Sequence, residues 1–190
     1  MKRKIHPILI GVALLFCFRA DAQAFQHLKK GALAVEYVAG DEEAAQRTLR
    51  LVEEALAEFA PLLPPGTLPI TTVIAPDADT FHRFARNYLP GQIAGLAQPE
   101  QGIIVLRGAR LRNPSDNYGA LIRHELVHIL LHRNTSEPAL PRWLNEGVAM
   151  LLAREYQFAS PITIGRMFLE NRMIAYKDLD WAFLNPGQET

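Results

Sequence analysis

Residues 117–133 read NYGALIRHELVHILLHR and contain the pattern HELVH, in which two histidines stand four residues apart. Residues at this spacing share one face of a helix, so the imidazoles of His124 and His128 can point at one ion. Glu125 lies one step round the helix, where its carboxylate can reach a water molecule on that ion. The stretch therefore predicts a helix with two metal ligands and a general base.

The flanks of this pattern are apolar and favour a largely buried helix. They are Leu121, Ile122, Leu126, Val127, Ile129, Leu130 and Leu131. Two histidines and a glutamate inside such a helix cost free energy unless each of them is paired. Hydrogen bonding within the core would satisfy them without a metal, and a five-residue pattern can arise by chance. We favour a metal site because one ion accounts for all three polar residues.

A catalytic zinc site needs a third protein ligand. His132 continues the histidine spacing, but eight residues of helix advance about 12 Å, too far for the first and third histidines to share one ion. Glu146 lies in PRWLNEGVA at 141–149, which opens with a proline suited to the first turn of a new helix. Its neighbours are mostly apolar. An exposed carboxylate is the alternative, and we favour Glu146 as the third ligand.

HELVH followed at this distance by PRWLNEGVA resembles the gluzincin metallopeptidases, and among them the bacterial peptidase MA-like domains with a W-L-x-E-G-x-A second motif. The resemblance implies zinc bound by His124, His128 and Glu146, with Glu125 as general base. It also implies a peptide substrate that pairs with a sheet edge, which we place at residues 103–106, although a purely structural strand is an equal alternative.

Two functions of this family need other residues in this chain. In the thermolysin-like branch an aspartate four residues after the third ligand orients the first histidine, and Met150 stands there instead. Glu155 and Asp116 are the candidate substitutes. Peptidases of this class also need a donor for the oxyanion on the attacked carbonyl. Tyr156 and Tyr176 are the candidates, with Tyr156 preferred as the catalytic residue, although either is more often a packing or surface tyrosine.

Residues 1–24 are predicted to be a signal peptide that is removed on export. A basic start precedes an apolar run at residues 8–18, and Ala22-Gln23-Ala24 is a small-x-small cleavage pattern. The run has eleven residues, well short of the roughly twenty that span a bilayer, so cleavage is favoured over retention as an anchor. We expect an exported protein, periplasmic or secreted, without stable membrane insertion after cleavage.

Residues 25–190 are expected to form one domain with its own core. The single cysteine, Cys17, lies in the predicted signal peptide, so the domain is expected to have no disulfide framework. The full chain has 20 basic and 20 acidic residues, and the predicted signal peptide holds four of the basic residues and one of the acidic ones. Its removal therefore leaves 16 basic and 19 acidic residues, a formal charge of −3. This balance indicates no nucleic-acid partner. The segment from Asn185 is turn-like where relatives continue with helices, so we expect either a short form or a domain truncated at its C-terminus.

The predicted elements indicate an α+β fold with a small antiparallel or mixed sheet and helices in the first half, and the two ligand helices in the second. The strands are expected at residues 33–38, 70–75, 93–97 and 102–106, the last two as an antiparallel hairpin. The helices are expected to begin at residue 41, at an Asp77 or Asp79 cap, at residue 117 and at residue 141.

The favoured function is an exported zinc-dependent metallopeptidase that hydrolyses peptide bonds by Glu125-assisted attack of a zinc-bound water. One alternative is a zinc hydrolase acting on a non-protein amide, such as a cell-wall cross-link. A second is an envelope protein that binds zinc without catalysis, although a structural site has no use for a base beside its ligand. A plain interaction module, in which HELVH is a coincidence, predicts no bound metal. The sequence does not indicate an oligomeric state.

Overall fold

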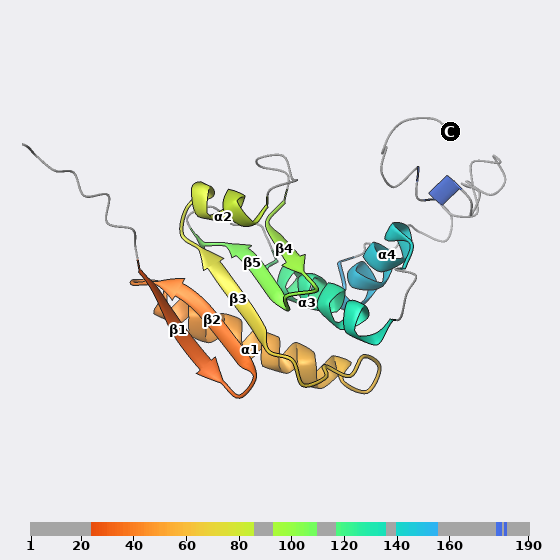
Figure 1. Ribbon diagram of the computed structural model, residues 1–190, viewed down its shortest axis with the longest axis horizontal. Coiled ribbons are helices and arrows are strands. Elements are labelled where there is room, and N and C mark those ends of the chain that lie inside the picture. The colour runs from red at the N-terminus through yellow and green to blue at the C-terminus, as the bar shows by residue number, and fades with distance from the viewer. Residues whose placement is uncertain are drawn as a thin grey trace, which may run out of the picture.

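The computed structural model describes residues 24–85, 93–109, 117–135, 140–155, 178, 179 and 181. In these residues the chain forms a mixed five-stranded sheet and four helices, which confirms the α+β class (Figure 1). The two ligand helices follow the sheet in the chain, as expected. None of the helices in this described part is long and apolar enough to cross a membrane.

The sheet has the strand order β1-β2-β3-β5-β4. Its strands are β1 (Phe25–Lys30), β2 (Leu33–Val38), β3 (Ile70–Ala75), β4 (Gly95–Gln98) and β5 (Ile103–Arg107). The pairs β1–β2 and β4–β5 are antiparallel hairpins, whereas β3 runs parallel to both β2 and β5. Strand β1 was not predicted from the sequence, because its residues are half-buried or exposed and show no apolar alternation.

Strand β4, and not β5, forms the free edge of the sheet beside β5. The expected edge at residues 103–106 lies in β5, which is hydrogen-bonded to β3 on one side and to β4 on the other. That expectation is therefore wrong. The reason is visible in the burial of Ile104, Val105 and Leu106, three consecutive residues with no exposed surface, as in a strand covered on both faces.

The helices are α1 (Glu42–Phe59), α2 (Ala78–Phe84), α3 (Tyr118–Asn134) and α4 (Arg142–Ala153). Alternate residues of β3 and β5 point to opposite faces of the sheet and pack in two clusters. Ile70, Ile104 and Leu106 pack with α1 and α3, and Val73 and Val105 pack with Phe81 of α2. Helices α1 and α3 therefore cover one face, and α2 covers part of the other (Figure 1).

Helix α3 begins at an Asn117 cap, whose side chain accepts a hydrogen bond from the backbone N–H of Ala120 at 3.2 Å. The guanidinium of Arg123, near this start, donates to the carbonyl of Leu152 near the end of α4. His128, farther along α3, contacts Asn145 near the start of α4. The two helices therefore run antiparallel, which places Glu146 opposite the HELVH motif.

Candidate metal centre

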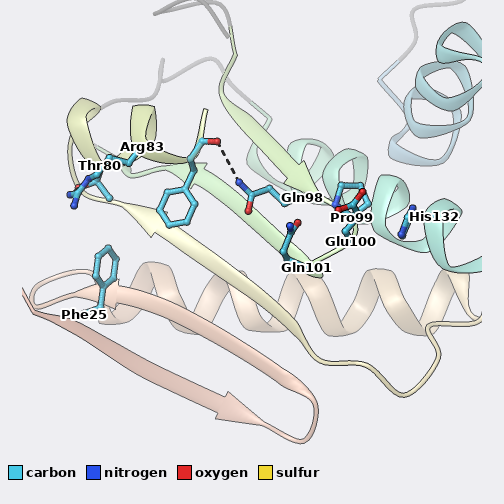
Figure 2. A pocket seen from close by; sticks show the side chains of 9 residues that line it. Phe25, Thr80, Arg83, Gln98, Pro99, Glu100, Gln101 and His132 are labelled. Atoms are coloured by element: carbon cyan, nitrogen blue, oxygen red, sulfur yellow. Dashed lines mark hydrogen bonds between the residues drawn. The ribbon is translucent and has the colours of Figure 1, made fainter. Parts of the chain in front are cut away.

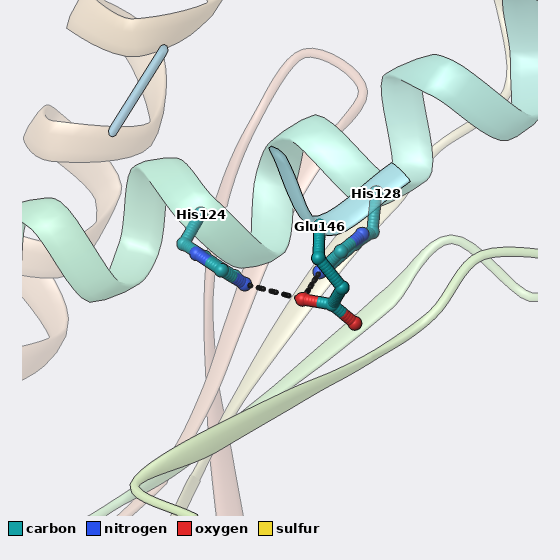
Figure 3. A group of neighbouring side chains, drawn as sticks. All are labelled: His124, His128 and Glu146. Atoms are coloured by element: carbon teal, nitrogen blue, oxygen red, sulfur yellow. Dashed lines mark ion pairs between the residues drawn. The ribbon is translucent and has the colours of Figure 1, made fainter. Parts of the chain in front are cut away.

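Helices α3 and α4 bring the three predicted ligands together. Figure 3 shows the carboxylate of Glu146 reaching from α4 to the imidazoles of His124 and His128, one turn apart on α3. Glu146 Oε2 lies 3.4 Å from His124 Nε2 and 3.7 Å from His128 Nε2. One ligand atom from each residue lies within 4.8 Å of the other two. The group thus has three donor atoms directed at one small volume.

The spacing of these atoms suits a small metal ion. Ligand atoms about 2.0–2.1 Å from an ion, at tetrahedral angles, stand about 3.3–3.5 Å from one another. The carboxylate-to-imidazole distances of 3.4 and 3.7 Å are close to that value. The three residues are half-buried, so they remain accessible to an ion from solvent. The group is therefore compatible with a bound metal ion.

Each imidazole is held through its Nδ1 atom by a second residue. Glu155 Oε2 lies 2.8 Å from Nδ1 of His124, and Asn145 Oδ1 lies 2.6 Å from Nδ1 of His128. Both partner atoms are acceptors, so Nδ1–H donates in each case. Nε2 of each imidazole is then the atom that faces Glu146, and once any proton on it is lost its lone pair is available to a metal ion.

Glu155 takes the orienting contact for which Met150 is chemically unsuited. Helix α4 ends at Arg154, which adopts the left-handed conformation with φ 60°. The backbone N–H of Glu155 then bonds to the carbonyl of Met150 at 3.1 Å, so the chain turns back and Glu155 reaches His124. Of the other predicted residues, Asp116 and both candidate tyrosines, Tyr156 and Tyr176, lie outside the described residues.

Asn145 is a site residue that was not predicted. It directly precedes Glu146, and neighbouring residues on a helix are about 100° apart, so both can face α3. The signal was a polar residue beside the third ligand in an otherwise mostly apolar helix. That signal is weak, because an asparagine at this position can equally face solvent.

The electrostatics of the group favour positive charge between its members. Burial lowers the pKa of His124, but hydrogen bonds with Glu146 and Glu155 outweigh it and raise the pKa to about 10. The bond with His124 lowers the pKa of Glu146 against the opposing effect of burial. Burial lowers the pKa of His128. Two carboxylates that stabilise a proton here would also stabilise a divalent cation.

Glu125 is buried, with 7% of its surface exposed, and does not belong to the ligand group. Burial raises its pKa to about 7, against a smaller opposing effect of a hydrogen bond from the backbone of Ala97 in β4. Strand β4 can come this close because residue 95 is glycine. A Cβ atom there would lie 3.1 Å from Leu106, 3.2 Å from Leu121 and 3.4 Å from Glu125. A carboxyl group with a pKa near neutrality can both accept and return a proton.

A cleft of about 510 Å³ lies over the metal group, and its lining includes β4, α3 and the first turns of α4. A second groove, of about 770 Å³, extends from Phe25 to His132 past α2 and the β4–β5 turn (Figure 2). His132 lines this groove and is not part of the metal group. The structure thus agrees with the exclusion of His132 as a ligand.

Comparison with protein-family models and with curated proteins finds no match for this chain. The chemistry of the site comes from its own residues. Three side chains that could hold a metal ion meet in one cleft between two antiparallel helices, and each histidine is held at Nδ1. The buried carboxyl group of Glu125 lines the same cleft. This arrangement can hold a cation and place a proton acceptor next to it.

Proposed function

We propose that this chain is an exported zinc metallopeptidase of the gluzincin type, which hydrolyses peptide bonds. The observation that carries the proposal is the buried carboxyl group of Glu125 beside the group of His124, His128 and Glu146 in one cleft. A site that only binds a metal needs the three ligands. A buried, non-ligating carboxyl group costs free energy, and proton transfer is a function that explains its presence.

His124, His128 and Glu146 would hold the zinc ion, because two imidazoles and one carboxylate are a donor set that zinc accepts. Zinc in such a site lowers the pKa of water and polarises a carbonyl group. Glu155 and Asn145 fix the orientation of the two imidazoles through Nδ1. The protein therefore supplies both the ligands and the contacts that orient them.

Glu125 would move one proton in two steps. Its carboxylate accepts a proton from the attacking water as the water oxygen bonds to the carbonyl carbon. The resulting carboxylic acid then donates that proton to the amide nitrogen as the carbon–nitrogen bond breaks. A pKa of about 7 suits both steps, because the group is neither a very weak base nor a very weak acid at neutral pH.

Strand β4 supports a peptide as the substrate. Its outer edge has no strand beside it within the described sheet, and residues of β4 line the cleft. An extended peptide added to this edge would pass close to Glu125, which already contacts the backbone of Ala97. This edge favours a peptide over a non-protein amide. We propose Tyr156, the residue after Glu155, as the donor to the carbonyl oxygen.

The first experiment measures metal content and peptide hydrolysis on three purified proteins: the unaltered chain, Glu125→Gln and Glu146→Ala. We expect one zinc ion per chain in the first two proteins and much less in Glu146→Ala. Glu125→Gln should lower kcat by about 10²–10⁴, the range found for loss of a general acid–base residue. Loss of zinc in Glu125→Gln would contradict its role as the base. An absence of zinc in all three would contradict the proposal.

A further inference from the structure

We propose that Arg142 makes the cleft selective for substrates with a carboxylate group close to the scissile bond. The inference rests on the proposed function, because it assigns a property to the peptide that the site would cleave. It comes from the position of one exposed guanidinium group in a cleft whose other charged side chains are acidic or are histidines.

Arg142 is the first residue of α4 and lines the same cleft as Glu125 and Glu146. It precedes Glu146 by four residues, so the two share one face of the helix with their Cβ atoms about 5–6 Å apart. Leu140 and Pro99 also line this cleft. Arg142 is therefore one turn of helix from Glu146 and on the wall of the same cleft.

Within the described part of the chain the guanidinium of Arg142 has no partner, unlike those of the other arginines on these two helices and their caps. Arg123 donates to Glu58 and to the carbonyl of Leu152, and Arg154 donates to Glu58. Arg133 donates to the carbonyls of two prolines. Among the described residues, Arg142 makes no hydrogen bond or ion pair. Its charge acts on Glu146 only at longer range, while that carboxylate faces the imidazoles.

An unpaired guanidinium at this position fits a carboxylate group of the substrate. Guanidinium and carboxylate groups form two parallel hydrogen bonds, a geometry that no neutral side chain reproduces. Residues of an extended peptide stand about 3.4 Å apart. A group next to Arg142 would therefore belong to a residue one or two positions from the scissile bond. Without Arg142, the carboxylates of Glu125 and Glu146 would repel an acidic substrate.

The carboxylate has two possible sources, an acidic side chain or the free C-terminus of a short peptide. The test uses the zinc-loaded full chain and peptides that differ only by Glu or Gln at each position near the cleavage site. A second series compares free and amidated C-termini. We expect kcat/KM to be about tenfold higher for the carboxylate member of one pair, as for one charge-assisted contact. The pair that shows the difference identifies the source.

Arg142→Gln should reduce that tenfold ratio to about one, and Arg142→Lys should restore part of it. The zinc content of both variants must equal that of the unaltered chain, which separates recognition from damage to the metal group. A ratio that is unchanged in Arg142→Gln, or that is close to one in the unaltered chain, would overturn the inference.

Binding to the zinc-loaded Glu125→Gln protein separates this inference from the proposed function. The same peptide pairs are titrated by fluorescence anisotropy against Glu125→Gln with and without Arg142→Gln. A carboxylate preference in binding that depends on Arg142 would support the inference even if no peptide were hydrolysed, and the absence of hydrolysis would contradict only the peptidase proposal. If neither member of any pair binds, the inference is wrong.

Discussion

The two ligand helices differ in what holds them. Helix α3 has nine buried residues and packs against both the sheet and α1, whereas α4 buries only Ala149 and Ala153 and leaves Leu151 53% exposed. Two of the predicted ligands therefore stand on an element of the core, and the third stands on an outer helix joined to α3 by polar contacts and by partly buried apolar residues such as Val148 and Leu152. The metal group thus combines a deeply buried half on α3 and a less buried half on α4, and we expect the two halves to differ in their response to mutation.

The largest effect should come from the core of α3. Leu130 has no exposed surface, and Leu130→Ala should lower the free energy of unfolding by about 2–5 kcal/mol, because it removes buried apolar atoms and leaves a cavity. The matched change on α4, Leu151→Ala, should cost less than about 0.5 kcal/mol. Urea unfolding of both variants makes the comparison. Equal costs would show that α4 is as deeply packed as α3.

The contacts that orient the histidines should have the next largest effect, on metal affinity. Glu155→Ala and Asn145→Ala should each weaken zinc binding about 10–100-fold, since each removes the acceptor at one Nδ1. Met150→Gln is the matched control, because Met150 lies on α4 and is 37% exposed. Competition with a chromophoric chelator measures all three affinities. An affinity in Glu155→Ala equal to that of the control would exclude Glu155 as an orienting residue.

The same difference explains which features the sequence predicts. Helix α3 is predictable because an apolar pattern and HELVH coincide in one continuous segment. The contact of Glu155 with His124 is not, because it depends on the left-handed turn at Arg154, a conformation uncommon for arginine. The strand order is also unpredictable from local pattern, since β5 becomes an interior strand only by pairing with β3, whose residues lie 32 positions earlier in the chain. The half of the site on α3 can therefore be predicted from one continuous segment, whereas the half that involves α4 and Glu155 depends on how distant segments pack.

Helix α4 is also attached through Glu58 on α1. Arg123 donates two hydrogen bonds to this carboxylate, at 2.7 and 2.9 Å, and Arg154 donates a third at 3.0 Å. The bonds from Arg123 are the main reason that the pKa of Glu58 falls from 4.5 to about 2. Glu58 therefore joins α1, the start of α3 and the cap of α4.

A lowered pKa stabilises the fold above the unfolded pKa, and that stability is lost as the pH falls from about 4.5 to about 2. The contribution should be about 1 kcal/mol or less, because the Glu58 side chain is 44% exposed and solvent screens the pair. Unfolding of the unaltered chain and of Glu58→Gln at pH 6 and at pH 2.5 tests this. The difference between them should shrink at the lower pH. A difference independent of pH would exclude the carboxylate charge as its cause.

The smallest expected effects are the changes in stability on replacing two glycines near the site, Gly147 and Gly95, and these changes should have opposite signs. A Cβ atom on Gly147 would meet no atom of another element within 4 Å in the described part of the chain, so the packing of the helices does not require glycine there. Gly147→Ala should therefore stabilise α4 by about 0.5–1 kcal/mol, through the higher helix propensity of alanine. Gly95→Ala should instead destabilise the protein, because its Cβ would crowd Leu106 and Leu121. Thermal unfolding reports both signs. If Gly147→Ala stabilises the fold and leaves zinc affinity unchanged but slows peptide hydrolysis, the space beside Gly147 belongs to the substrate.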